Sequence, residues 1–130
     1  MEPVRLIKPG QRSANTAQTP GMVRQAGIAP DLTNSKSFWM GFVSAPPGPS
    51  GAHHHGGAES GIYIVKGRIR MYYGDKLQHT LEAGAGDFLY VPPLTIHVEE
   101  NVTKEPVELV VARNAGDFMV VNVPDPRKSG

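Results

Sequence analysis

Closely spaced glycines and prolines divide the chain into short segments of apolar and β-branched residues. There are 15 glycines and 12 prolines among 130 residues. Long helices tolerate neither residue in their interior, whereas short strands joined by tight turns use both. The segments recur at spacings of roughly 8–12 residues, which is typical of a sandwich or a closed barrel. The sequence therefore predicts an all-β fold.

We expect eight strand segments between residues 37 and 124. The clearest are 61–67 and 68–73, where side chains alternate between two faces and Gly67 supplies the turn of a hairpin. Pro92 and Pro93 end another strand, because proline cannot donate a hydrogen bond to a neighbouring strand. The other segments are 37–44, 77–84, 86–93, 96–102, 106–114 and 117–124.

Residues 1–36 differ from the rest, because prolines and glycines interrupt any periodic pattern there. We expect an N-terminal arm with at most one short strand, packed on the domain or on a partner subunit, and a disordered tail is the alternative. Residues 37–122 then form the β-domain and residues 123–130 a C-terminal tail. Edge strands of such a domain need to be covered, so the arm favours strand exchange in a homodimer.

Composition excludes several classes of function. Thirteen basic and twelve acidic residues give a formal charge of +1, so nothing indicates nucleic acid or an anionic membrane as a partner. Without cysteine, the chain has no disulfide, thiolate catalyst or sulfur ligand for a metal. No signal peptide and no apolar stretch of about 18 residues is evident, so we expect a cytoplasmic protein.

Three consecutive histidines, His53 to His55, lie between glycine-rich segments. Alternate side chains of a strand share a face, so His53 and His55 point the same way and His54 the opposite way. For the run alone, a solvated loop is the alternative. Glu59 follows a short bend, and His97 follows a later strand that returns toward the run. Three imidazoles and a carboxylate suit one divalent ion of Fe, Mn, Ni, Cu or Zn.

The spacing of these residues resembles the two motifs of the cupin family. The first motif, G-x5-H-x-H-x3–4-E-x6-G, is similar to the stretch that holds His53, His55, Glu59 and Gly67. The second, G-x5-P-x-G-x2-H-x3-N, is similar to the stretch that holds Gly86, Pro92, His97 and Asn101. The resemblance implies an antiparallel double-stranded β-helix, or jelly-roll barrel, with the irregular N-terminal arm outside it. It also implies that His53, His55, Glu59 and His97 bind the metal.

Three positions depart from the family pattern. The glycine before the histidines falls on Pro47, with Gly48 one residue late, and Leu94 replaces the glycine in the turn of the second motif. The spacing from Glu59 to the hairpin glycine is one residue too long, which puts Ser60 where the glutamate aligns. A slip of one residue in a strand exchanges its faces. Either a β-bulge compensates for the extra residue, so that Glu59 still points to the metal, or Glu59 is not a ligand.

The resemblance implies a metal inside the barrel and a small-molecule substrate that enters at one mouth. Candidate pocket side chains are Phe42, Ile64, Met71, Phe88 and Tyr90. We expect a metal-dependent enzyme with oxygenase-type or isomerase/lyase-type chemistry, although no dedicated acid or base emerges from the sequence. A non-catalytic module that binds or senses a metal or metabolite is the main alternative, and a purely structural metal is a third.

Overall fold

The computed structural model describes residues 1–115 and 119–128. Its strands are β1 (Val23–Ile28), β2 (Trp39–Ala45), β3 (Gly48–Pro49), β4 (His53–His54), β5 (Ser60–Lys66), β6 (Arg68–Tyr73), β7 (His79–Gly84), β8 (Phe88–Val91), β9 (His97–Asn101), β10 (Val107–Arg113) and β11 (Val121–Asn122). Two short helices, η1 (Pro9–Gln11) and α1 (Pro30–Thr33), lie near the N-terminus. None of the helices in the described part of the chain has the length and apolarity to cross a membrane.

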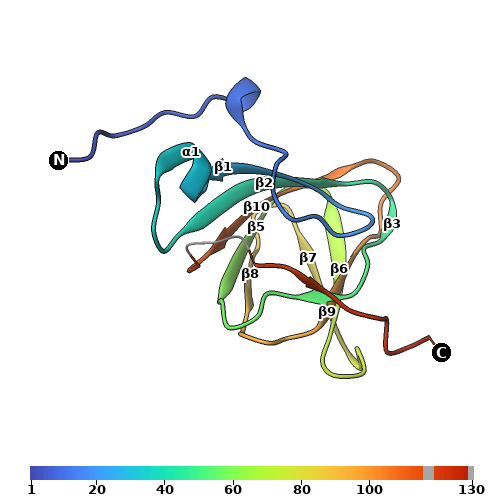
Figure 1. The fold of residues 1–130 in the computed structure, drawn as a ribbon. Coiled ribbons are helices and arrows are strands. Elements are labelled where there is room, and N and C mark those ends of the chain that lie inside the picture. The colour runs from blue at the N-terminus through green and yellow to red at the C-terminus, as the bar shows by residue number, and fades with distance from the viewer. Residues whose placement is uncertain (116–118, 129–130) are drawn as a thin grey trace.

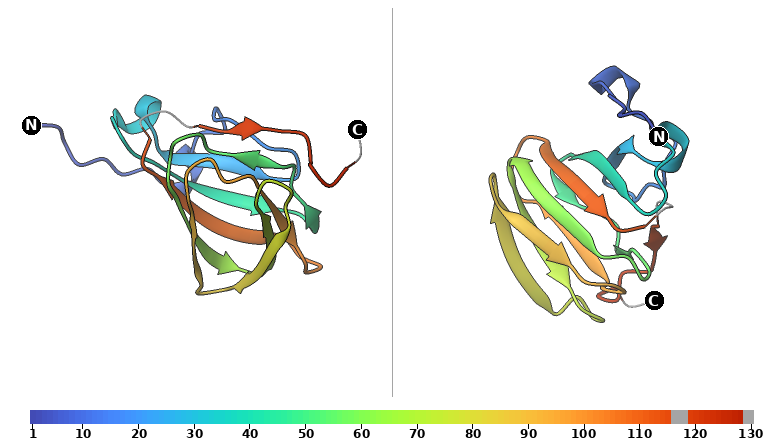
Figure 2. Two further views of the ribbon diagram at one scale, coloured as in Figure 1. Left: turned by 90° about the horizontal axis from the view of Figure 1, so that it is seen from below. Right: turned by 90° about the vertical axis from the view of Figure 1, so that its left-hand side faces the viewer.

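The strands form two antiparallel sheets that face each other (Figure 1, Figure 2). One sheet has the order β1-β2-β10-β5-β8 and the other the order β11-β4-β9-β6-β7, with β3 paired to β9. Strands that are distant in sequence therefore lie side by side, as β2 and β10 do. This arrangement confirms the predicted all-β class and the jelly-roll barrel. Of the predicted strand 117–124, residues 117 and 118 lie outside the described residues.

Alternation along the strands builds the core between the two sheets. Every second residue of β2 from Trp39 to Ala45 is buried, and so is every second residue of β10 from Val107 to Arg113. The apolar members of these rows pack with Ile64 and other inward side chains into one cluster. Because side chains of a strand alternate between the two faces of the sheet, a polar residue at an inward position lies in the interior beside its apolar neighbours.

At two of the positions that depart from the cupin pattern, the backbone adopts a left-handed conformation. Gly48 has a φ of +106°, so the glycine that comes one residue late still supplies a left-handed conformation. Leu94 has a φ of +60°, a conformation that costs a non-glycine residue about 1–2 kcal/mol. Its amide donates a hydrogen bond to the carbonyl of Gly56, at 2.8 Å. The turn before His97 therefore keeps its shape although the glycine is missing.

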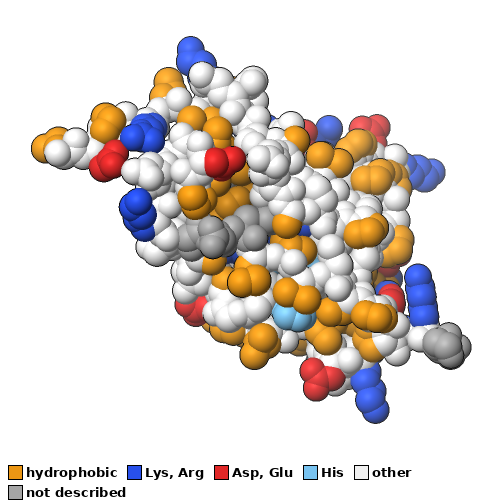
Figure 3. Space-filling view, viewed as in Figure 1, with side chains coloured by type: hydrophobic (Ala, Val, Ile, Leu, Met, Phe, Trp, Pro, Cys, Tyr) orange, Lys and Arg blue, Asp and Glu red, His pale blue; other side chains and the backbone are white. Residues whose placement is uncertain are grey.

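The N-terminal segment begins with residues that project from the barrel, and further along the chain it contributes one strand. β1 extends the first sheet by pairing with β2, and Ser13 forms a further bridge with Ala26. The first residues extend away from the two sheets (Figure 1), and the side chains of Val4 and Leu6 are exposed. Apolar side chains are visible on this projecting end, whereas histidine shows only as a small area on the same face (Figure 3).

Candidate metal centre

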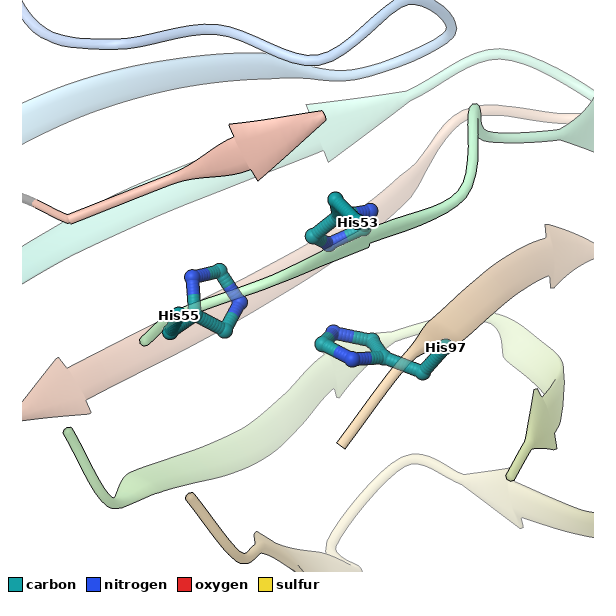
Figure 4. Close-up of side chains that lie close together, drawn as sticks. All are labelled: His53, His55 and His97. Atoms are coloured by element: carbon teal, nitrogen blue, oxygen red, sulfur yellow. The ribbon is translucent and has the colours of Figure 1, made fainter. Parts of the chain in front are cut away.

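Two neighbouring strands bring three histidines together inside the barrel. His53 in β4 pairs directly with His97 in β9, and His55 follows on the same side of the chain as His53. Their rings point toward one another (Figure 4), with centroids 4.2 Å apart for His53 and His97 and 5.1 Å apart for His55 and His97. His53 and His97 are fully buried and His55 is 4% exposed. His54 is half-buried, and its Nδ1 accepts a hydrogen bond from the amide of Gly56.

Backbone carbonyls hold all three rings in one tautomer. Nδ1 of each ring lies 2.9 Å from a carbonyl oxygen, that of Gly51 for His53, Met119 for His55 and Thr95 for His97. A carbonyl oxygen only accepts, so each Nδ1 donates, and Nε2 of a neutral ring is left with its lone pair. Such outer hydrogen bonds orient metal-binding histidines in proteins. One ring nitrogen from each of the three lies within 4.8 Å of those of the others.

The interior keeps two of these histidines neutral. Burial, with a smaller contribution from the neighbouring His97, lowers the pKa of His53 to about 3. Burial and the positive charge of Arg113 lower the pKa of His55 to about 2. A metal ion binds the neutral form of imidazole, so both rings are ready to coordinate at neutral pH.

Glu59 lies outside the histidine cluster. β5 begins at Ser60, which is buried, while Glu59 is exposed immediately before it. Its carboxylate accepts a hydrogen bond from the hydroxyl of Tyr90 at 2.7 Å and another from the amide of Asn114 at 3.0 Å. The hydrogen bond to Glu59 raises the pKa of Tyr90. The residue slip noted in the sequence thus turns Ser60 inward and Glu59 outward, because successive side chains of a strand face opposite sides.

A different carboxylate, Glu99, lies beside the cluster. Its Oε1 is 3.4 Å from Nε2 of His97, and the residue is 6% exposed. Burial favours the neutral acid, but the close approach of His97 and the charge of Arg24 hold the pKa of Glu99 well below its usual range. Glu99 was not among the sequence-based candidates. The available signal was its position two residues after His97, which puts both on one face of β9.

Two buried arginines complete the polar interior, and neither was a sequence-based candidate. Nη2 of Arg113 lies 3.4 Å from Nε2 of His55, and its guanidinium stacks 4.8 Å from the centre of the Trp39 ring. Arg24 donates from Nη1 to the hydroxyl of Thr19 at 2.8 Å. Burial and the charge of Arg24 lower the pKa of Arg113 to about 9, so its guanidinium remains charged at neutral pH.

The predicted pocket residues occupy four different environments. Met71 and Tyr90 line a cavity of about 440 Å³ between β6, β7 and β8, which Thr95 also borders. Phe42 lines another cavity, of about 320 Å³, beneath the N-terminal segment. Ile64 is fully buried in the core, and Phe88 is 80% exposed on the outer face. The cavity that contains Met71 and Tyr90 is also bordered by Thr95, whose carbonyl oxygen accepts the hydrogen bond from Nδ1 of His97.

The donor groups of the cluster fit a divalent transition metal. Three imidazoles whose Nε2 atoms converge form a site of the kind used for Fe, Mn, Ni, Cu and Zn. Nε2 of His53 and Nε2 of His97 are buried without a hydrogen-bond partner in the described structure, apart from the contact of His97 with Glu99. Buried polar atoms are costly when they lack a partner, and a bound cation would supply one.

Comparison with known proteins identifies the family. The sequence profile of the cupin domain matches residues 41–113, more than half of the chain. The chain therefore belongs to the cupin family, as its two motifs indicated. No curated protein sequence matches it.

Solved structures of oxalate decarboxylase from Bacillus subtilis share the fold. One determined at pH 4.6 has a TM-score of 0.72 and 22% identity over 84% of this chain and 29% of the other. Another, which concerns the Mn(II) centres of that enzyme, has a TM-score of 0.72 and 22% identity over 85% and 30%. A third, of a mutant of the same enzyme, has a TM-score of 0.72 and 23% identity over 84% and 30%. The present chain thus spans less than a third of each of these oxalate decarboxylase chains.

Proposed function

We propose that this cupin is a metal-dependent enzyme that acts on a small anionic organic molecule. The observation that carries the proposal is the convergence of three imidazoles on one buried point, each with Nδ1 bonded to a carbonyl and Nε2 turned inward. A divalent ion held there would supply Lewis-acid chemistry, or a binding position for dioxygen beside the substrate. Oxygenase-type and isomerase/lyase-type reactions are both open to such a site.

The arginine beside the cluster supports an anionic substrate. Arg113 keeps its charge at neutral pH and lies within 3.4 Å of His55. A guanidinium presents paired N–H donors that match a carboxylate, so it can bind and orient one next to the histidines. The similar oxalate decarboxylase acts, as its name says, on a small dicarboxylate, and it contains Mn(II). The cavity bordered by Met71, Tyr90 and Thr95 has room for a small carboxylate, and Thr95 is two residues from His97.

Turnover on small carboxylic acids tests the proposal. The full chain, loaded separately with Mn(II) and Fe(II), would be supplied with short mono- and dicarboxylates while dioxygen consumption and carbon dioxide release are followed. We expect at least one acid to be converted by the wild type. Arg113→Lys keeps the charge but not the paired donors, so it should raise KM strongly at unchanged metal content. Metal binding without turnover of any acid would contradict the enzyme assignment.

One observation favours a non-catalytic module as the second candidate. All three histidines are at most 4% exposed, so access to the cluster in this conformation is narrow. A cupin that only holds a metal or a metabolite and reports it to a partner protein needs no wide entrance. Tight metal binding with no conversion in the turnover assay would support this candidate.

The homodimer expected from the sequence remains a proposal. The N-terminal residues project from the barrel and expose Val4 and Leu6, which a second copy could cover. Light scattering on the full chain should give twice the mass of one chain. Removal of residues 1–8 should weaken the association, and a monodisperse monomer of the full chain would contradict the proposal.

A further inference from the structure

Nε2 of His97 and Oε1 of Glu99 face each other. This arrangement is favourable only if a proton or a cation lies between the two atoms. Nδ1 of His97 gives its proton to the carbonyl of Thr95, so Nε2 of the neutral ring presents a lone pair. This lone pair lies 3.4 Å from Oε1 of Glu99. Two acceptors at this distance repel unless a second proton or a cation lies between them.

The second oxygen of Glu99 is also buried. Oε2 has no hydrogen bond from any of the described residues, and the whole residue is 6% exposed. A buried carboxylate oxygen without a donor costs more free energy than most single interactions contribute. A proton on His97 would satisfy Oε1 alone, whereas a metal ion can be reached by either oxygen of the carboxylate.

The distance from His97 to Glu99 is the one that two ligands of a single ion adopt. Imidazole nitrogen and carboxylate oxygen bind such ions at about 2.0–2.2 Å, so adjacent ligand atoms lie roughly 3.0–3.5 Å apart. The separation of 3.4 Å between Nε2 and Oε1 falls in this range. His97 in turn pairs directly with His53, and one ring nitrogen from each of the three histidines lies within 4.8 Å of those of the others.

We propose that Glu99, and not Glu59, is the carboxylate ligand of the metal site. Both oxygens of Glu59 already accept hydrogen bonds outside the cluster, from Tyr90 and Asn114. Glu99 is carried by the same strand face as His97 and therefore needs no bulge to reach the site. The inference rests on the proposed metal site. The competing explanation is a histidine–glutamate ion pair in which Glu99 takes no part in metal binding.

Matched amide substitutions of the two glutamates separate these explanations. Glu99→Gln and Glu59→Gln keep the size of the side chain but remove a negative charge that binds metals well. Affinity for Mn(II) would be measured by competition with a chelator, and the visible spectrum of the Co(II)-loaded protein would report the ligand set. We expect Glu99→Gln to lower Mn(II) affinity by at least about 10-fold and to shift the Co(II) bands. Glu59→Gln should leave both unchanged.

Three results would overturn the assignment of Glu99. These are wild-type affinity and an unshifted spectrum in Glu99→Gln, a loss in Glu59→Gln as large as that in Glu99→Gln, or no metal binding by the wild type. The last result alone also removes the proposed metal site, whereas the first two leave it standing. Should Glu99→Gln fail to fold, Glu99→Asp retains a shorter carboxylate. It should bind Mn(II) more weakly than the wild type while still shifting the Co(II) bands.

Discussion

Glu59 and Glu99 each follow a cluster histidine within a few residues in sequence, yet Glu59 is exposed and Glu99 is buried. Glu99 is two residues from His97 on a continuous strand, so it shares the inward face and is buried. Glu59 precedes the inward Ser60 and is exposed, held by Tyr90 and Asn114. The comparison teaches that strand parity decides which carboxylate meets the histidines, and that spacing along a motif does not.

A substitution on the inner face of the sheets should cost more stability or metal affinity than one on the outer face. Inside, rings and carboxylates have fixed partners and no access to water, so each change leaves a cavity, an overlap or an unpaired polar atom. Outside, the same groups exchange a protein contact for water. The following predictions rank the inner positions by expected effect and, where the chain offers one, add an outer control.

Acid should destabilise the metal-free protein through its inner histidines. The folded state holds the pKa of His53 near 3 and that of His55 near 2, whereas both are near 6.5 when unfolded. Below about pH 6.5 the unfolded chain therefore takes up protons that the folded chain does not, and stability falls. Between about pH 6.5 and 5 we expect a loss of about 1.5–2 kcal/mol per histidine, or about 3 kcal/mol together.

Urea unfolding in the presence of a chelator, at several pH values, measures this loss. His53→Gln removes one of the two groups and should reduce the slope of stability against pH by about half. An unchanged slope in this variant would show that His53 is not held in the neutral form.

Loss of an inward histidine should weaken metal binding far more than loss of its outward neighbour. His53→Ala removes a buried imidazole whose Nε2 faces the cluster, and we expect Mn(II) affinity to fall by at least about 100-fold. His54→Ala changes a half-buried ring outside the cluster and should stay within about two-fold of the wild type. Competition with a chelator measures both. Equal losses in the two variants would contradict the assignment of faces in β4.

Two glycines test the same distinction for packing. A Cβ at Gly41 on the inner face would overlap the Trp39 ring and lie 2.7 Å from the Gln25 carbonyl oxygen. At Gly61 on the outer face, no atom of residues 1–115 or 119–128 lies within 4 Å of the added Cβ. Thermal or urea unfolding should show a loss of about 1–3 kcal/mol for Gly41→Ala. For Gly61→Ala the change should be within about 0.5 kcal/mol. A neutral Gly41→Ala would mean that the Trp39 ring can move away.

The smallest effect is expected at the turn before His97. Leu94→Gly relieves a left-handed conformation, and Leu94 is 67% exposed, so little packing is lost. Glycine also gives the unfolded chain more freedom, which offsets part of the gain. We expect the free energy of unfolding to rise by about 0.5 kcal/mol. Leu94→Ala, which keeps the strain, is the control, and a Gly variant less stable than the Ala variant would contradict this reasoning.

Much of the fold follows from local sequence. The hairpin of β5 and β6 turns at Gly67, which has a φ of +93°, at the position where alternation and glycine predicted it. Pro92 and Pro93 end β8 after Val91, as expected of residues that cannot donate to the sheet. These features depend on a few neighbouring residues, which is why the pattern of Gly, Pro and β-branched residues was sufficient.

The site was harder to predict, because it depends on contacts between distant strands. The convergence of His53, His55 and His97 agrees with the motif spacing. Arg24 comes from the segment expected to be an arm, and Arg113 from the end of β10, far along the sequence, so no local pattern joins them. The slip before Ser60 left two outcomes open for Glu59, and only the three-dimensional pairing of β5 shows which way each side chain points.

Metal content is the most direct test of the central claim that the three buried histidines hold a metal ion. Plasma mass spectrometry on tag-free protein would be compared with a variant that carries both His55→Ala and His97→Ala. We expect near one equivalent of Fe, Mn, Ni, Cu or Zn in the wild type and almost none in the variant. An absence of metal from the wild type, even after reconstitution, or equal metal in the two proteins, would contradict the claim.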